Sequence, residues 1–202
     1  MSDQDKGKVL RLYFAHAVNI YNTPIEDAAV KLISNHFPSA EIENPNQLHH
    51  QIGYKKWAQR AHESDTKHKG MNYFFDEVLP LCNGCVAMPF LDRRMGLGVA
   101  GEAKWFIEKG LPVWIFVPTK NPSIELVEEF AQTLYNGLFF IRPIKDSEVD
   151  QLLTNDPVLV VPHEETRLRT WLVYNRQMRP YQEAHKVSMP IPDGFYPQPQ
   201  IN

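Results

Sequence analysis

Short apolar runs alternate with segments of helical periodicity along most of this chain, and this alternation constrains its fold more than any other feature. Apolar runs typical of buried strands lie at residues 9–15, 85–90, 113–117 and 138–141, and a shorter one lies at 40–43. Near-continuous apolar strands separated by helices are typical of a parallel sheet that is covered on both faces. The sequence therefore predicts an α/β protein.

The segments between these strands carry the signals of helices. Thr23-Pro24-Ile25-Glu26 combines an N-cap, a proline at the first helical position and a capping-box glutamate. Helical spacing follows it and also predicts helices over 71–81 and 123–134, whereas 47–70 is expected to be a helix followed by a loop. These elements predict a three-layer domain of the flavodoxin or Rossmann type, with a mostly parallel sheet of about five strands and helices on both faces.

The C-terminal region has a different pattern, so we expect a main domain over 1–150 and an extension over 151–202. Residues 156–161 are compatible with a further strand and 163–174 with a helix, whereas 189–202 is rich in proline and has no periodicity. The tail contains aromatic side chains that gain by being buried. We expect it to lie as an arm on its own or a neighbouring subunit, in a homo-oligomer.

Charge and hydropathy exclude two classes of partner. The 202 residues carry a formal net charge of -3, which provides no basic field for the phosphates of a nucleic-acid polymer. No apolar run is long enough to span a bilayer, so no membrane partner is expected. The charged N-terminus lacks an apolar segment suited to secretion, which predicts a cytoplasmic protein. A free nucleoside or nucleotide suits this composition better than a polymer.

Cys82 and Cys85 form a lone C-x-x-C motif, which elsewhere binds zinc or performs redox chemistry. Here the pair is predicted to join the end of a helix to the start of a strand, whereas a thioredoxin-like pair stands at a helix N-terminus. The dipeptide His49-His50 lacks the spacing of zinc-finger ligands. We therefore expect two reduced packing cysteines, no metal site and no redox cofactor.

Glu102 follows Gly98-Val99-Ala100-Gly101 and is expected in the first turn of a helix. A carboxylate directly after a glycine-rich loop lies where backbone N–H groups are unpaired and a ligand can approach closely. Such a carboxylate is a candidate nucleophile for the anomeric carbon of a sugar, although it can also be an acid that interacts with the helix dipole. His16, Asn44 and Asp92 are expected beside it, at the carboxyl ends of the parallel strands.

Three motifs occur in a fixed order within residues 9–118. Leu12-Tyr13-Phe14-Ala15 lies in the first strand, Asp76 precedes the strand around Val86, and Gly98-x-x-x-Glu102 opens a helix. In their order and spacing these motifs resemble those of the nucleoside 2-deoxyribosyltransferase family and the related nucleotide N-glycosidases. The resemblance implies cleavage or transfer at a nucleoside N-glycosidic bond without a cofactor, and active sites shared between subunits.

The resemblance also implies roles for four side chains. Glu102 would attack the anomeric carbon, displace the base and form a glycosyl ester, while the Tyr13 hydroxyl would hold the carboxylate in place. Asp92 and Asp76 compete as the acid that protonates the leaving base, with Asp92 the first choice for the base and Asp76 for the sugar. Attack on the ester by a second base would make the protein a transferase, and attack by water a hydrolase.

Other residues are candidates for substrate binding. Gly98, His16 and Asn44 are expected near the nucleoside, and Arg93-Arg94 is a candidate for binding a 5′-phosphate, as in a nucleoside 5′-monophosphate N-glycosidase. Plainer interpretations exist for two of these. His16 is also compatible with capping backbone groups in its loop, and Arg93-Arg94 with a surface turn paired with acids.

A non-catalytic nucleotide-binding or sensing module is the rival function. In that case Tyr13 would be a core aromatic residue, and Asp76-Glu77 a solvated helix face. The two functions differ in whether Tyr13 and Glu102 touch in a cleft lined by aromatic residues. A binding module needs the cleft, but it does not need this contact.

Overall fold

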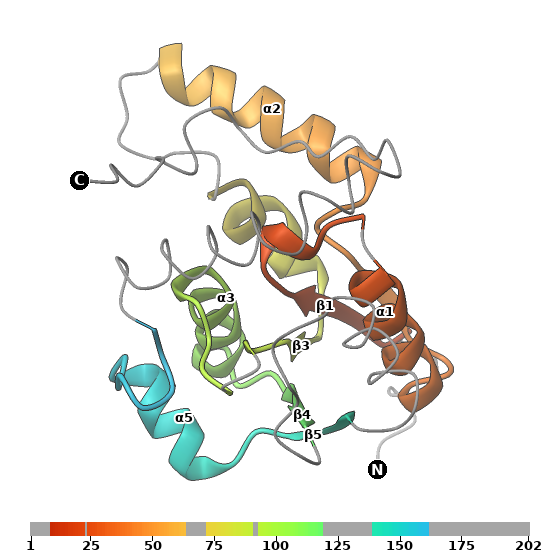
Figure 1. Cartoon of the computed structure of the whole chain (residues 1–202). Coiled ribbons are helices and arrows are strands. Elements are labelled where there is room, and N and C mark those ends of the chain that lie inside the picture. The colour runs from red at the N-terminus through yellow and green to blue at the C-terminus, as the bar shows by residue number, and fades with distance from the viewer. Residues whose placement is uncertain (1–8, 23, 64–71, 91–92, 119–138, 162–202) are drawn as a thin grey trace, which may run out of the picture.

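The structure is a computed structural model, and it describes residues 9–22, 24–63, 72–90, 93–118 and 139–161. These residues form a sheet with helices packed against it (Figure 1). The predicted helices over 123–134 and 163–174 and the tail over 189–202 lie outside the described residues, as do Thr23, Asp92 and most of the expected extension.

The sheet has five strands in the order β2-β1-β3-β4-β5. Its first three neighbouring pairs are parallel, whereas β4 and β5 pair in antiparallel fashion. The α/β class and a mostly parallel sheet are therefore confirmed, with a mixed edge that the alternation of strands and helices did not predict. The strands are β1 (Arg11–Ala15), β2 (Glu41–Glu43), β3 (Gly84–Ala87), β4 (Val113–Pro118) and β5 (Phe139–Pro143).

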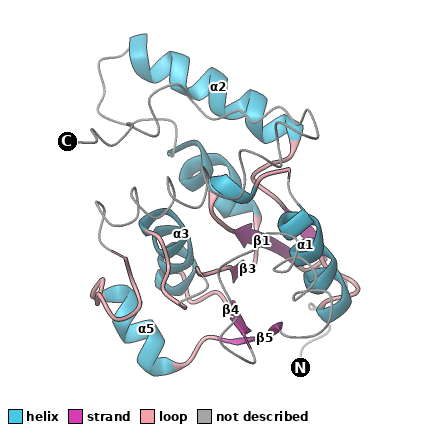
Figure 2. Cartoon of the chain, in the orientation of Figure 1, coloured by secondary structure: helices cyan, strands magenta, loops and turns pink. Residues whose placement is uncertain are grey.

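In the described residues, three α-helices and several tighter or wider turns lie between the strands, and a further α-helix follows the last strand (Figure 2). The predicted helix over 71–81 is instead mostly a π-helical turn followed by a 3-10 turn, which contains Pro80. Proline has no N–H to donate to an α-helical ladder, so the regular helix cannot continue through this position. The elements are α1 (Pro24–His36), α2 (Leu48–Glu63), α3 (Leu97–Glu108), α5 (Asp146–Leu153), η2 (Val18–Ile20), η3 (Phe74–Val78) and η4 (Leu79–Leu81).

Alternate residues of β1 enter two different cores, because successive side chains of a strand point to opposite faces. Leu12 and Phe14 pack with the apolar stripe of α1, whereas Tyr13 and Ala15 pack with α3. Figure 1 accordingly shows α1 and α3 on opposite sides of the sheet. These four side chains of β1 are fully buried, whereas Arg11 is partly exposed.

The helix that carries Glu102 begins earlier than predicted. Gly96 is its N-cap residue and Leu97 its first residue, so Gly98 and Gly101 lie inside the helix and Glu102 lies in the second turn. The expectation of a glycine-rich loop followed by a first-turn carboxylate is therefore wrong. The buried stripe of α3, which includes Ala103 and outweighs the weak helix propensity of glycine, explains the early start.

Helix α2 packs against the start of η3 through several aromatic side chains. A Cβ atom at Gly53 would overlap the end of the Tyr73 ring as it lies in the structure. The ring centroid of Trp57 lies 6.4 Å from that of Tyr73, and that of Tyr54 lies 6.2 Å from that of Phe74. Tyr73 and Phe74 thus form much of the contact between α2 and this segment.

The two cysteines lie in the core beneath α3. Both are free, both are buried, and they belong to the same core cluster, which is the place predicted for packing cysteines. Burial raises the pKa of Cys82 to about 12 and that of Cys85 well above its usual range, so both remain thiols at neutral pH.

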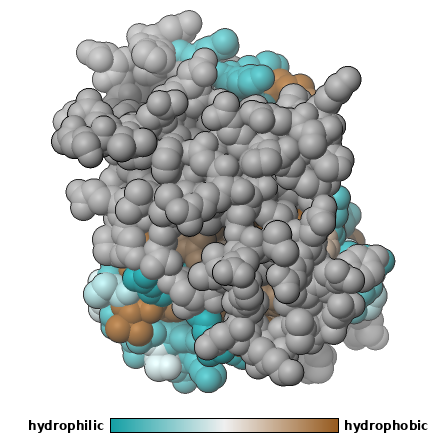
Figure 3. Space-filling model, in the orientation of Figure 1, coloured by the Kyte–Doolittle hydropathy of each residue, from teal (hydrophilic) through white to brown (hydrophobic). Residues whose placement is uncertain are grey.

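The segment 156–161 adds no full strand to the sheet. Val160 forms an isolated parallel bridge with Met95, just before α3. The described part of the surface seen in Figure 3 carries both hydrophilic and hydrophobic residues, with apolar areas near α5 and near α2. Leu153 and Val158 are among the exposed large apolar residues. Among the described residues, no helix combines the length and the apolar character needed to cross a bilayer.

Candidate active site

Tyr13 and Glu102 meet between the sheet and α3. The Tyr13 hydroxyl donates a hydrogen bond of 2.8 Å to Oε1 of Glu102, across 89 positions of sequence. Tyr13 is 0% exposed and Glu102 is 5% exposed. The contact predicted between these two side chains is therefore present, although the carboxylate lies one helical turn further along α3 than expected.

Apolar and weakly polar groups surround this pair. The Tyr13 ring lies 6.4 Å from Phe74 of η3 and 6.3 Å from Phe106 of α3, measured between ring centroids. Cys85 pairs with Tyr13 in the parallel ladder of β1 and β3. Within the described part of the chain, the Glu102 carboxylate has a single hydrogen-bond partner, the Tyr13 hydroxyl.

This environment disfavours a negative charge on Glu102. Burial raises its pKa to about 8, and the hydrogen bond from Tyr13 acts in the opposite direction without offsetting the burial. Burial and the nearby carboxylate also raise the pKa of Tyr13 well above its usual range, so the phenol keeps its proton as a donor. The pair therefore consists of a neutral phenol and a carboxyl group that gains or loses its proton near neutral pH.

His16 and Asn44 belong to a second polar cluster, which is organised by Glu26 at the carboxyl ends of β1 and β2. His16 Nε2 lies 3.2 Å from Oε1 of Glu26, and Asn44 donates to the same oxygen at 2.9 Å. Asn46 donates to Oε2 at 2.8 Å, and the N–H of Asn22 donates there as well. The expectation that His16 and Asn44 lie together is met, but the residue that joins them is Glu26.

The pKa of Glu26 is shifted in the opposite direction from that of Glu102. Burial raises the pKa of Glu26, but the hydrogen bonds and charge of His16 and the donors Asn44 and Asn22 outweigh burial and lower it overall. His16 Nδ1 also lies 2.9 Å from the backbone oxygen of Phe14, and its ring stacks on the Phe14 ring. His16 thus contacts backbone and Glu26, as the interpretation of a loop-capping residue predicts.

The sequence pattern indicated that Glu26 is a capping-box residue. It did not indicate that Glu26 also accepts hydrogen bonds from side chains of other elements. The signal was present, since an acid in the first turn of α1 follows a polar loop that contains Asn22. Asn22 itself has a positive φ of 57°, a conformation that asparagine tolerates better than most residues. The donors Asn44 and Asn46 follow β2 in the sequence, and no local pattern predicts that their side chains contact Glu26.

The other predicted site residues that the structure describes are Asp76, Gly98, Arg93 and Arg94, and Gly98 lies one helical turn before Glu102 in α3. Asp76 lies exposed on η3, which agrees with a solvated helix face, and Gly98 is an exposed residue inside α3. Arg93 is exposed in a turn closed by hydrogen bonds between Phe90 and the Arg93 and Arg94 backbone. Arg93 has a φ of 70° and Arg94 is partly buried, while Asp92, between Phe90 and Arg93, lies outside the described residues.

Comparisons of the chain with models of protein families, with curated proteins and with solved structures find no match. The geometry of Tyr13 and Glu102 is therefore the ground on which a function can be proposed.

Proposed function

We propose that this protein cleaves or transfers at the N-glycosidic bond of a small nucleoside or nucleotide, with Glu102 as the nucleophile. The observation that carries the proposal is the 2.8 Å hydrogen bond between the Tyr13 hydroxyl and the buried Glu102 carboxylate. A non-catalytic nucleotide-binding module has no need of such a contact. The proposal includes a three-layer domain of the flavodoxin or Rossmann type, and a homo-oligomer that acts in the cytoplasm.

The proposed reaction has two steps on one carboxylate. Ionised Glu102 attacks the anomeric carbon, the bond from that carbon to the base nitrogen breaks, and the base leaves with the electron pair and takes up a proton. A second base or a water molecule then attacks the glycosyl ester and releases the carboxylate. Tyr13 contributes by holding one carboxylate oxygen, so that the other faces the sugar without a loss of rotamer freedom at the moment of attack.

The ionisation of Glu102 gives this proposal a pH signature. Its pKa of about 8 means that only a minority of the free protein carries the anionic nucleophile at pH 7. The value of kcat/KM should therefore rise with pH until about pH 8 and then level off. A value that instead falls above pH 8 would indicate that protonated Glu102 serves as a general acid in the same cleavage.

The source of the leaving-group proton is part of the proposal. We keep Asp92 as the first choice and Asp76 as its competitor. Loss of the acid should slow the release of natural bases far more than the release of an activated nitrophenol, which departs without a proton. Assays of Asp92→Ala and Asp76→Ala on both kinds of substrate identify the acid, and equal losses on both substrates mark a structural role.

The decisive experiment is a substrate screen combined with covalent trapping. The protein is incubated with nucleosides and 5′-nucleotides, with and without a second base, and the released or exchanged base is detected by chromatography. A 2-fluoro analogue of any substrate found should then add the mass of its sugar to the peptide that contains Glu102. If base is released but the added mass lies on another residue, or no nucleoside or nucleotide reacts, the proposal is wrong.

A further inference from the structure

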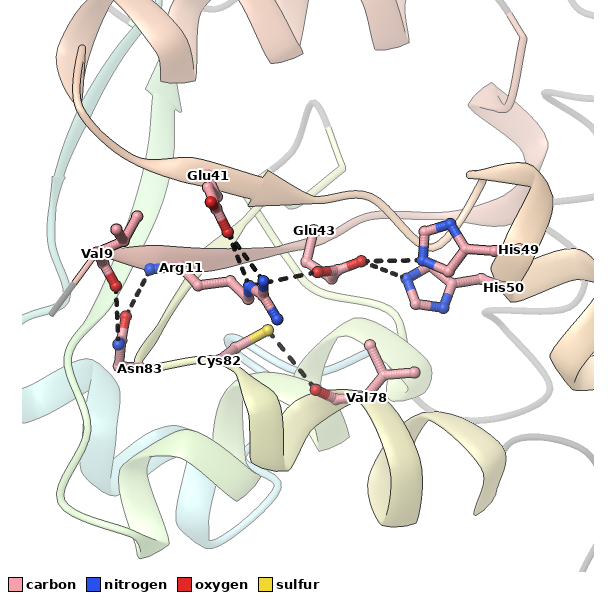
Figure 4. A network of polar contacts seen from close by, with 9 residues as sticks. All are labelled: Val9, Arg11, Glu41, Glu43, His49, His50, Val78, Cys82 and Asn83. Atoms are coloured by element: carbon pink, nitrogen blue, oxygen red, sulfur yellow. Dashed lines mark hydrogen bonds and ion pairs between the residues drawn. The ribbon is translucent and has the colours of Figure 1, made fainter.

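A second group of ligand-type side chains lies near the edge of the sheet, and Glu102 is not part of it. Glu43 ends β2, and His49 and His50 lie in the first turn of α2 (Figure 4). Oε1 of Glu43 lies 2.6 Å from Nε2 of His50 and 3.3 Å from Nε2 of His49. Both imidazole rings thus point toward one carboxylate oxygen, and one ligand atom from each residue lies within 4.8 Å of the others.

The fold brings these residues together through a short turn. Glu43 pairs with Tyr13 in the parallel ladder, which places it on the α3 side of the sheet beside Arg11. The backbone then reverses, with Gln47 N–H donating to the Asn44 oxygen and His50 N–H donating to the Gln47 oxygen. The first turn of α2 therefore lies over the end of β2, and two adjacent histidines face one carboxylate.

We propose that Glu43, His49 and His50 bind a divalent transition-metal ion, with Zn²⁺ as the best-matched ion. Two imidazole nitrogens and one carboxylate oxygen form a donor set that suits zinc, and Mg²⁺ prefers sites made of oxygens alone. In a tetrahedral zinc site with ligands about 2.1 Å from the metal, neighbouring ligand atoms are about 3.4 Å apart. The Glu43 to His49 distance of 3.3 Å already fits. The shorter contact to His50 opens by less than about 1 Å on binding.

Further side chains hold the proposed ligands in this orientation. The other ring nitrogen of His50, Nδ1, lies 3.1 Å from the Tyr73 hydroxyl, which leaves Nε2 for the metal. Oε2 of Glu43 lies 3.7 Å from Nε of Arg11, which leaves Oε1 for the metal. Outer contacts of this kind fix the ring and carboxylate orientation in known metal sites. Arg11 also pairs with Glu41 at 2.9 Å, so its positive charge is shared with a second carboxylate.

The site opens on a groove of about 670 Å³ whose charge favours a cation. Among the described residues that line it, Glu41, Glu43 and Glu77 are the acids and, besides the two histidines, Arg11 is the base. His49 has a 64% exposed side chain, so an ion can reach the three ligand atoms from solvent. With three protein ligands, a zinc ion keeps a fourth position for water or for an anionic oxygen of a molecule in the groove.

The test is a titration of the tag-free, metal-stripped protein with Zn²⁺ by calorimetry. We expect one equivalent to bind, and no saturable binding of Mg²⁺. His49→Ala should weaken Zn²⁺ binding more than about 100-fold, because removal of a ligand exceeds the 10-fold to 100-fold losses typical of outer contacts. Glu43→Gln should have a similar effect, and Tyr73→Phe should cost about 10-fold. His36→Ala is the matched control, since His36 is an exposed histidine at the end of α1.

Co²⁺ provides a second readout of the ligands. A site of two imidazoles and one carboxylate gives d–d absorption bands without the charge-transfer band of a thiolate ligand. Unchanged binding by His49→Ala or Glu43→Gln would overturn the proposal, and so would the absence of saturable Zn²⁺ binding. A thiolate band that is lost in Cys82→Ser would also overturn it, by assigning the ion to the neighbouring cysteine. Because His49 is exposed, its variant is expected to keep the fold, which circular dichroism checks.

Discussion

Two glutamates that are buried in the described part of this protein differ in how their charge is balanced. Glu26 is 3% exposed and Glu102 is 5% exposed, so burial alone does not distinguish them. Glu26 receives hydrogen bonds from two asparagine side chains and a backbone N–H and lies against His16, and its pKa is lowered. Glu102 receives one hydrogen bond from Tyr13, and its pKa is raised to about 8.

Burial raises the pKa of both glutamates, and only at Glu26 do hydrogen bonds and the charge of His16 outweigh it. A carboxylate whose oxygens all have donors is stable as an anion and has little reason to react. A carboxylate with one donor is poorly stabilised as an anion, which makes it a stronger base and nucleophile once it is ionised. Glu26 therefore suits a structural role, and Glu102 suits chemistry.

The largest effect expected is the loss of turnover in Glu102→Gln. A neutral amide cannot attack the anomeric carbon, so turnover of the substrate identified by the screen should fall by about 10³-fold or more. Glu108→Gln makes the same change at an exposed position of α3 and should leave turnover unchanged. If Glu102→Gln retains the activity of the unmodified protein, the two glutamates do not differ in the way proposed.

The next largest effect concerns the other glutamate. Glu26→Gln replaces an acceptor for several donors by an amide whose NH₂ group faces them, and should lower the free energy of unfolding by about 3 kcal/mol. Urea denaturation at pH 7 measures this change. Asp27→Asn, at the adjacent exposed position of α1, should change it by less than about 0.5 kcal/mol. Equal effects of the two substitutions would show that the contacts of Glu26 stabilise the fold no more than those of the exposed acid at position 27.

A smaller effect is the pH dependence of stability that Glu102 produces. Its pKa is raised in the folded state to about 8 from the usual value of 4.5, so between these values the folded protein binds more protons than the unfolded chain. Stability is then lost as pH rises through this window. The difference in unfolding free energy between Glu102→Gln and the unmodified protein should grow in favour of the variant, by about 2 kcal/mol from pH 6 to pH 8. A difference that stays constant with pH would place the pKa of Glu102 near its usual value.

The smallest effect expected is that of Tyr13→Phe, which removes only the donor. Turnover should fall about 10-fold because the carboxylate loses its orientation. The hydrogen bond from Tyr13 lowers the pKa of Glu102, so its removal should move the rising limb of kcat/KM to higher pH. A pH profile that does not move would mean that the hydroxyl does not contact the reacting form of the carboxylate.

Local sequence patterns were sufficient to predict the strands that form the sheet. They were insufficient to predict which polar side chains contact one another at its edges. The apolar runs around Tyr13, Val86 and Ile115 predicted β1, β3 and β4 because a buried strand shows itself in consecutive apolar residues. The contact of Tyr13 with Glu102 was also predicted, through the order of motifs. The position of Glu102 in the second turn was not, since packing of α3 against the sheet decides where that helix begins.

The polar clusters were harder to predict because their members approach from different elements. Asn44 and His16 were expected at one edge, but nothing local indicates that both end on Glu26, 18 and 10 residues away. The same holds for Glu43 and His50, which meet only after the chain reverses between β2 and α2. The spacing of residues in the sequence indicates to which face of a helix or strand a side chain points. It carries little information on how two such elements pack against each other.

Gly53 and Tyr73, which touch where α2 meets η3, also have a consequence for how this protein can evolve. In the observed arrangement a side chain at position 53 would overlap the end of the Tyr73 ring, whose hydroxyl lies 3.1 Å from Nδ1 of His50. The Tyr73 ring would therefore have to move, and its contact with His50 would change with it. In descendants of this chain we expect glycine at 53 to be retained more often where tyrosine is kept at 73 than where it is lost.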